Sequence, residues 1–366
     1  MTSSYKADQV GSLLRSPDVL EARTARIEGR IEAEQLREVE DKAILDVLET
    51  QRQIGIDVFT DGEFRRSDFR SDLAEAVEGM ASVQHPLRWF GPQSETMEIA
   101  DSWMVNGKLL QKRRMTAHES SFLKEHAHGP YKVTIPSAGF MAYRTYKQGV
   151  TDQFYSTVAA LIDDMAAIVK NEVHALVAEG VPYIQIDAPG YTTFMDQRQR
   201  QELQDRGVDP DMAFDEVLAS DNASFAGARQ EGVTLALHLC RGNYRSHWMG
   251  TGGYDAIAER LFNSLDVDRF LLEYDSDRAG GFEPLRFVPK GKLVVLGLVT
   301  TKHGGLESQD DLLRKIDEAS KYMPLEDMAL SPQCGFATDA RGNALSWDEQ
   351  RRKLELVVDT AHKVWG

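Results

Sequence analysis

The sequence is poor in cysteine, in positive charge and in long apolar runs, and each shortage excludes a class of protein. Only Cys240 and Cys334 occur in 366 residues, too few for a small secreted scaffold held together by disulfides. No run of 18 apolar residues exists, so we expect no membrane-spanning helix. Residues 1–7 are polar and lack the apolar stretch of a secretory signal. We therefore expect a cytoplasmic protein with reduced cysteines, although one disulfide between the pair stays open at this point.

The deficit of positive charge bears on the partners of the protein. The chain carries 58 acidic and 42 basic residues, a net charge of −16, and the acidic excess is spread along its length. Such a surface repels nucleic acid and anionic lipid. We expect neither as a partner, and expect small-molecule substrates instead. The sequence is compatible with a homo-oligomer and does not determine the oligomeric state.

The sequence also lacks the G-x-G-x-x-G fingerprint of a dinucleotide-binding, doubly wound sheet. It shows instead a regular alternation of short apolar runs with longer helical patterns. Runs such as VTLALHL and KLVVLGLV are apolar at successive positions, which is typical of parallel strands. The alternation predicts an α/β fold, a (β/α)8 TIM barrel that spans residues 1–366 as one catalytic domain. The predicted strands are Gln9–Ser12, Asp57–Asp61, Lys132–Ile135, Tyr183–Asp187, Thr234–Leu239, Arg269–Tyr274, Lys292–Val299 and Met328–Ser331, and the clearest helices are Glu34–Gln53, Phe154–Glu179, Tyr254–Ser264, Gln309–Tyr322 and Asp348–Val364.

One stretch, about residues 71–130, breaks this alternation after the second predicted strand. It contains Trp89, Phe90 and the basic run Lys112–Arg114, and it is too long for a simple loop. We expect an insertion with some structure of its own, of the kind that forms lids or oligomer contacts. A solvated surface is the simpler interpretation of the basic run.

Candidate metal ligands lie at the ends of three predicted strands. His238 and Cys240, in LALHLCRGN, are two residues apart, so their side chains point to the same side of the strand. On its own, this pair is better explained by a core histidine beside a buried cysteine. Glu273, in FLLEYDSD, and Cys334, in LSPQCGF, also end strands, and in a barrel all such ends meet at one mouth. One histidine, two thiolates and one carboxylate form a tetrahedral set suited to zinc.

The charge of this ligand set indicates what the zinc would do. Two thiolates and a carboxylate outweigh the +2 of the ion, and such an electron-rich set weakens the power of zinc to generate hydroxide. It still deprotonates an incoming thiol, whose pKa is about 8.5 when free. We therefore expect a zinc-dependent enzyme that transfers an alkyl group to a thiol. The thiol could displace Glu273 or enter as an extra ligand.

Further polar residues follow predicted strands and would surround the same mouth. Ser12, Glu63 and Asp187 are candidates for substrate binding, and the two carboxylates could bind an amino group. Asp187, Lys302 and His303 are candidates for catalysis, with Lys302 or His303 as acid or anion binder. Each residue taken singly is also compatible with a loop cap or a surface group.

These motifs together resemble the catalytic C-terminal domain of the cobalamin-independent methionine synthase family. The resemblance runs from DQVGSLLRSP through GEFRRSDF, IQIDAP, HLCRGN and SPQCGF to the C-terminal helix. It implies a zinc-dependent (β/α)8 methyltransferase that converts homocysteine to methionine and uses the four strand-end residues above as zinc ligands. It implies that Ser12, Glu63 and Asp187 hold the polar end of the amino acid. Lys302 lies near the position of the family's catalytic histidine, with His303 beside it.

Two departures from the family leave the alkyl donor open. The family's D-E-P reads Asp187-Ala188-Pro189 here, and the aromatic residue expected to stack on folate after VTI is absent from Pro136–Gly139. The chain looks like the short, single-barrel branch of the family. That branch includes enzymes that open epoxides with coenzyme M, so alkylation of another thiol is an alternative. A non-catalytic barrel with a structural zinc is a third possibility, from a different functional class.

Overall fold

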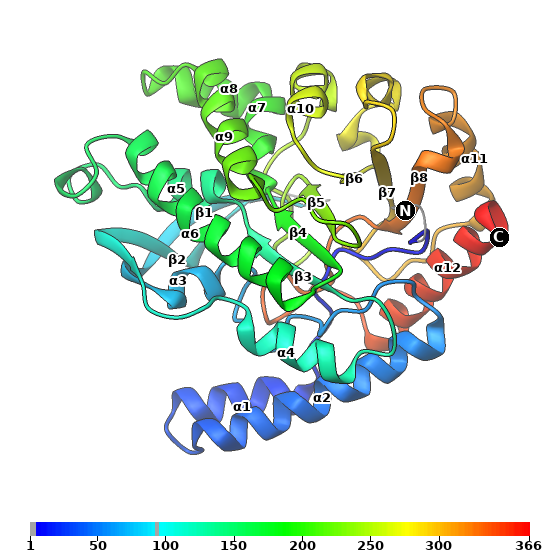
Figure 1. The fold of residues 1–366 in the computed structure, drawn as a ribbon, viewed down its shortest axis with the longest axis horizontal. Coiled ribbons are helices and arrows are strands. Elements are labelled where there is room, and N and C mark those ends of the chain that lie inside the picture. The colour runs from blue at the N-terminus through cyan, green and yellow to red at the C-terminus, as the bar shows by residue number, and fades with distance from the viewer. Residues whose placement is uncertain (1–4, 92–94) are drawn as a thin grey trace.

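The computed structural model describes residues 5–91 and 95–366, so residues 1–4 of the polar N-terminus lie outside the described residues. At its centre is a six-stranded parallel sheet in the order β3-β4-β5-β6-β7-β8, with helices packed around it (Figure 1). A separate sheet pairs β1 with β2. No helix in the described part is both long and apolar enough to cross a membrane. The strands are β1 Val77–Phe90, β2 Glu95–Gln111, β3 Lys132–Pro136, β4 Tyr183–Asp187, β5 Thr234–Leu239, β6 Arg269–Glu273, β7 Leu293–Val299 and β8 Met328–Pro332.

The six parallel strands form where the sequence has its continuous apolar runs. Every residue of these strands is buried, because helices cover one face and the packed interior covers the other. β4 and β5 have the predicted bounds, and each of the other four differs from its prediction by one residue at one end. The α/β class and the parallel sheet are therefore confirmed.

The two predicted strands nearest the N-terminus, Gln9–Ser12 and Asp57–Asp61, are wrong as strands. The structure has isolated bridges near them instead: Ala7 bridges to β8, and Phe59 bridges to the residue before β3. A side chain replaces the continuing ladder, because Gln9 Nε2 donates to a backbone oxygen of the second segment at 2.8 Å. These two segments follow the edges of the sheet without extending it as regular strands.

The helices begin and end where local chemistry allows. α6, for example, starts after Thr157, whose hydroxyl accepts from Ala160 N, and ends at Gly180 in the left-handed conformation (φ 81°). Glycine adopts that conformation without strain, so Gly180 caps the helix. The helices are α1 Pro17–Ile27, α2 Ala33–Ile54, α3 Ser71–Ala76, α4 Ala117–His126, α5 Ala138–Thr145, α6 Val158–Glu179, α7 Thr192–Met195, α8 Gln197–Asp205, α9 Pro210–Phe225, α10 Ala258–Ser264, α11 Gln309–Ala319 and α12 Trp347–Trp365.

Residues 71–130 hold α3, a long antiparallel hairpin made of β1 and β2, and α4. The hairpin is paired from Val77 opposite Gln111 to Phe90 opposite Glu95, and it does not join the parallel sheet. Its far end is attached elsewhere: Phe90 N donates to Trp248 O at 2.7 Å, and Trp248 N donates to Phe90 O at 2.9 Å. Because Trp248 lies in the segment after β5, the hairpin tip is fixed to the loop that follows the H-x-C pair.

A buried ion cluster links the N-terminal segment to the sheet. Asp8 contacts Lys132 Nζ at 2.7 Å, accepts a hydrogen bond from Tyr183 OH at 2.9 Å and lies 3.6 Å from Arg269. All four side chains are buried. The carboxylate of Asp8 therefore lies beside two buried cations, one from β3 and one from β6.

We predict that Asp8→Asn destabilises the fold strongly, because it keeps the volume of the side chain but removes the buried carboxylate that lies beside Lys132 and Arg269. The free energy of unfolding, measured by urea denaturation, should fall by about 3–5 kcal/mol. Asp46→Asn is the matched control, since Asp46 pairs with Lys42 on the exposed side of α2, and it should leave the urea midpoint unchanged. Identical midpoints for wild type and Asp8→Asn would show that this cluster does not anchor the N-terminal segment.

Candidate metal centre

Three side chains with metal-binding atoms meet at the carboxyl ends of the parallel strands. His238 lies near the end of β5, Cys240 follows β5 and Cys334 follows β8. One ring nitrogen of His238 and the two sulfur atoms all lie within 4.8 Å of one another. His238 Nε2 is 3.7 Å from Cys334 Sγ, and all three residues are buried. The register of the sheet thus turns a distant pair of motifs into one compact group.

The two cysteines are free thiols that differ in their affinity for a proton. Hydrogen bonds from the Cys240 thiol and from His238, together with the charge of Lys302, lower the pKa of Cys334 well below its ordinary value. The hydrogen bond with the Cys334 sulfur, together with burial, raises the pKa of Cys240. Of the two thiols, Cys334 is therefore the one that gives up its proton more readily.

Glu273, the fourth predicted ligand, is buried at the end of β6 and is already engaged by protein donors. Its Oε2 accepts from Arg241 N and from Gln333 Nε2, both at 2.7 Å, and Arg278 lies 3.4 Å from its Oε1. Burial raises the pKa of Glu273, but the positive charges around it outweigh burial, so its pKa lies below the ordinary range. Glu273 is thus a carboxylate beside the three-residue group rather than one of its members in this conformation.

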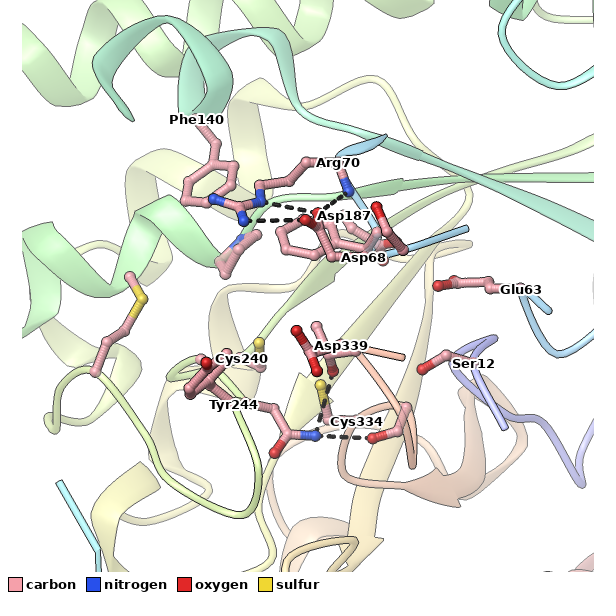
Figure 2. Close-up of a pocket in the computed structure, with 18 of the residues that line it drawn as sticks. Ser12, Glu63, Asp68, Arg70, Phe140, Asp187, Cys240, Tyr244, Cys334 and Asp339 are labelled. Atoms are coloured by element: carbon pink, nitrogen blue, oxygen red, sulfur yellow. Dashed lines mark hydrogen bonds and ion pairs between the residues drawn. The ribbon is translucent and has the colours of Figure 1, made fainter. Parts of the chain in front are cut away.

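The three metal-binding side chains line a cavity of about 320 Å³. The predicted substrate-binding residues Ser12, Glu63 and Asp187 line the same cavity. In Figure 2, Ser12 and Glu63 face Cys240 and Cys334 across the open space, and Asp187 lies above them. The structure thus brings six of the predicted site residues to one place.

Glu63 reaches the cavity from an unusual turn. It has a φ of 58° and follows Gly62, whose φ is 69°, and a non-glycine residue in this region of the backbone is strained. Its Oε1 accepts from Thr134 Oγ1 at 2.9 Å. Its Oε2 is buried and has no hydrogen-bond partner in the described structure, and burial raises the pKa of Glu63. A buried carboxylate oxygen without a donor suits a ligand that carries a cationic donor.

Asp187 occupies the last position of β4, opposite His238 in the sheet register. Its Oδ1 accepts from Gln185 Nε2 at 2.8 Å. Burial raises the pKa of Asp187 to about 7, even though the charge of His238 opposes the shift. Two carboxylates with raised pKa therefore face the cavity, and both gain from a positively charged ligand.

Lys302 and His303 do not line the cavity. Lys302 is buried, and its Nζ donates to Gly242 O at 3.1 Å and to Asn243 Oδ1 at 3.3 Å. Gly242 and Asn243 do line the cavity, so Lys302 holds part of its wall by hydrogen bonds. The charge of Lys302 also helps to lower the pKa of Cys334. His303 is exposed.

Sequence reasoning missed the outer wall of the cavity. Trp89, on the hairpin, stacks on Tyr244 with ring centroids 4.9 Å apart and planes at 18°, and Phe140, on α5, lines another part. Ala138, in the stretch where the resemblance implies a stacking aromatic residue, is fully buried in the core. The only sequence signal for this wall was the aromatic content of the 71–130 stretch. The same wall holds two ion pairs, Arg70–Asp68 at 2.9 Å and Arg341–Asp339 at 2.7 Å.

The whole sequence, and not only the residues of the cavity, matches a known protein family. The family described as cobalamin-independent synthase, catalytic domain, matches residues 6–363. The chain belongs to this family. Membership confirms the resemblance inferred from the motifs, and family and fold together support methyl transfer of the methionine synthase type.

Individual relatives agree with this assignment. The uncharacterised Bacillus subtilis protein YxjH is 38% identical, over 99% of this chain and 95% of its own length. A Listeria monocytogenes structure, provisionally assigned as a vitamin-B12-independent methionine synthase, has a TM-score of 0.76 at 28% identity and covers 100% of this chain and 99% of its own. A B12-independent methionine synthase from Shewanella sp. W3-18-1, solved with selenomethionine, shares the fold with a TM-score of 0.73 at 20% identity, over 97% and 96% of the two chains.

The attachment of the hairpin generates a prediction about Tyr244. Tyr244→Ala removes the ring on which Trp89 stacks, so the Phe90 and Trp248 amides, which pair at the tip, should exchange with deuterium about threefold to tenfold faster. Tyr244→Phe keeps the ring and loses the hydroxyl, which contacts Arg341, so exchange at the tip should stay close to that of wild type. If the tip exchanges equally fast in Tyr244→Ala and wild type, the stack does not hold the hairpin.

Proposed function

We propose that this protein is a zinc-dependent methyltransferase that methylates the sulfur of homocysteine to give methionine. The proposal rests on one observation: His238, Cys240 and Cys334 line the same cavity as two buried carboxylates, Glu63 and Asp187. The first set suits an ion that activates a thiol. The second set suits the ammonium group of an amino acid.

The donor atoms present fit zinc. In a tetrahedral site, with Zn–S of about 2.3 Å and Zn–N of about 2.0–2.1 Å, neighbouring sulfur and nitrogen ligands lie about 3.6 Å apart, and His238 Nε2 and Cys334 Sγ are 3.7 Å apart. Zinc would be held by His238, Cys240 and Cys334, with Glu273 as the proposed fourth ligand. Glu273 would have to exchange a present hydrogen bond for that role. When bound, zinc would lower the pKa of the substrate thiol and keep its sulfur nucleophilic.

The cavity residues would hold the amino acid while the sulfur reacts. The Oε2 atom of Glu63 and the carboxylate of Asp187 accept from the ammonium group, and the Ser12 hydroxyl donates to the carboxylate of the substrate. The substrate sulfur loses its proton and bonds to the methyl carbon, while the leaving atom of the donor keeps the electron pair and takes up a proton. Asp187 would move a proton, and Lys302 and His303 remain proposed as acid or anion binder.

The two carboxylates also separate this function from its main alternative. A sulfonate thiol such as coenzyme M needs Arg or Lys and no nearby anion, whereas Glu63 and Asp187 place two acidic groups beside the metal ligands. Of the arginines that line the cavity, Arg70 and Arg341 are each paired with an aspartate, and Arg144 lies in the part that a second cavity shares. A purely structural zinc is disfavoured for a different reason, since the ligand group lines an open cavity and a structural site is closed.

We further propose that the whole chain is one (β/α)8 barrel domain with an insertion at about 71–130. Backbone bonds support closure: Leu330 N donates to Lys6 O at 2.8 Å, Asp57 N to Ala7 O at 3.1 Å, and Lys132 N to Phe59 O at 2.9 Å. These contacts join β8 to β3 through the two N-terminal segments. Such closure brings the carboxyl ends of all strands to one mouth.

Zinc binding is testable by substitution. Cys240→Ser and Cys334→Ser each replace a thiolate by a hydroxyl, which is a poor zinc ligand, so zinc should fall from one equivalent per chain to a small fraction. Elemental analysis after dialysis gives the content. Ser331→Ala, close in sequence to Cys334 but outside the ligand group, is the control and should keep its zinc. Full zinc in both cysteine variants would contradict the assignment.

Recognition of the amino group is tested by Glu63→Gln. Losing a charge-assisted hydrogen bond of roughly 1.5–3 kcal/mol should weaken homocysteine binding by about tenfold to a hundredfold, with zinc still in place. Isothermal titration of the zinc-loaded protein measures the dissociation constant. Glu75→Gln is the control, because Glu75 lines the same cavity but is half-exposed. Unchanged affinity in Glu63→Gln would remove Glu63 from the proposed site.

A further inference from the structure

Arg15 is buried and is not among the described residues that line the metal-site cavity. Its hydrogen bonds go to main-chain carbonyl groups of two separate segments. Nη2 donates to Glu63 O at 2.6 Å and to Arg66 O at 3.0 Å, and Nη1 donates to Ala337 O at 2.7 Å. One planar guanidinium group therefore joins the turn that carries Glu63 to the segment that follows Cys334.

The residues just before Arg15 are bonded to the same two segments. These are residues 62–66, which we call the carboxylate turn, and residues 334–338, which we call the thiolate segment. Leu13 N donates to the carboxylate turn at 3.0 Å, and Ser12 O accepts from the thiolate segment at 2.8 Å. The chain that leads to Arg15 thus lies between the turn and the segment, and the Arg15 side chain binds both.

The backbone of the carboxylate turn needs support, because Glu63 lies in the left-handed region with a φ of 58°. Described contacts of its main chain hold it there. Glu63 N donates to Asp61 Oδ1 at 2.8 Å, and Glu63 O accepts from Arg66 N at 3.1 Å and from Arg15. Loss of the Arg15 contact would therefore free the turn to relax toward a commoner backbone conformation, and the Glu63 carboxylate would move with it.

Arg15 also brings positive charge close to Glu63. Burial raises the pKa of Glu63, and the charges of Arg66 and Arg15 oppose that rise. Burial lowers the pKa of Arg15 to about 10, and the charge of Glu63 opposes that fall. Each group thus favours the charged form of the other, although the hydrogen bond between them involves the main chain of Glu63.

We propose that Arg15 is a positioning residue that fixes the distance between the Glu63 carboxylate and the Cys334 thiolate. An amino thiol has to reach the carboxylate with its ammonium group and the metal with its sulfur. A fixed distance therefore selects thiols by the number of carbon atoms between nitrogen and sulfur, which is three in homocysteine and two in cysteine. This inference rests on the proposed function, because it concerns which amino thiol the same site accepts.

The test measures the binding of three thiols to the zinc-loaded full chain by titration calorimetry. They are homocysteine, the shorter cysteine, and 4-mercaptobutanoate, which is homocysteine without its ammonium group. Arg15→Lys keeps the charge but cannot fork between two segments, so the preference for homocysteine over cysteine should fall by about tenfold. Affinity for 4-mercaptobutanoate should change by less than about threefold, since this thiol makes no ammonium contact. Arg15→Met should lose at least as much preference, and Arg15→Lys carries the test if Arg15→Met does not fold.

Two further variants separate positioning from a general loss of stability. Arg114→Met is the matched control, because Arg114 also joins distant elements, through ion pairs with Glu172 and Glu179 of α6. It should lower the urea midpoint and leave the ratio of the two dissociation constants unchanged. In a Glu63→Gln background the ammonium contact is already weakened, so Arg15→Lys should add little further loss of preference.

Amide exchange in the ligand-free protein tests the same contacts without a thiol. Arg66 N donates to Glu63 O, and Phe336 N donates to Ser12 O, so both amides should exchange with deuterium about tenfold faster in Arg15→Lys. Exchange as slow as in wild type, or an unchanged thiol preference in Arg15→Lys, overturns the inference. If the wild-type protein binds neither amino thiol, the proposed function fails, and amide exchange alone decides whether Arg15 holds the two segments together.

Discussion

Parallel hydrogen bonding between β4 and its neighbours aligns the last residues of each strand, and the chemistry of the site depends on that alignment. The register places Asp187 opposite His238, and the segment after β8 brings Cys334 to within 3.7 Å of the same imidazole. None of these side chains is close to the others in sequence except within the H-x-C pair. A slip of one residue would turn each side chain to the opposite face of its strand and separate the group.

The resulting cavity is lined by buried carboxylates that are removed from water. Glu63 and Asp187 line the cavity, and the pKa of each is raised. Glu273, at the end of β6, keeps its charge because Arg241 and Gln333 donate hydrogen bonds to it. Buried carboxylates cost free energy unless something positive pairs with them. The protein supplies that pairing for Glu273 and leaves it incomplete for the carboxylates of the cavity, which is why we assign those to substrate and Glu273 to the metal.

The hairpin lies outside the parallel sheet but forms part of the cavity wall. It adds nothing to the parallel sheet, yet its tip is bonded to Trp248 and its Trp89 walls two cavities at once. The same contacts link this wall of the cavity to the segment that carries Cys240. A change in how the hairpin packs would therefore alter this wall of the cavity while leaving the metal-binding side chains in place.

Much of this protein was determined by sequence alone, for a definite physical reason. Strands buried on both faces need continuous apolar runs, so β3 to β8 could be read to within one residue, and strand alternation put His238 and Cys240 on one side. The N-terminal segments could not be read this way, because the Gln9 side chain takes over from the backbone ladder. Tertiary structure alone decided the rest. In the folded chain, Gln333 donates to Glu273, the buried Lys302 donates to Asn243, and Trp89 stacks on Tyr244 at the cavity. Each of these contacts joins residues that are far apart in the sequence, so the sequence pattern could not predict it.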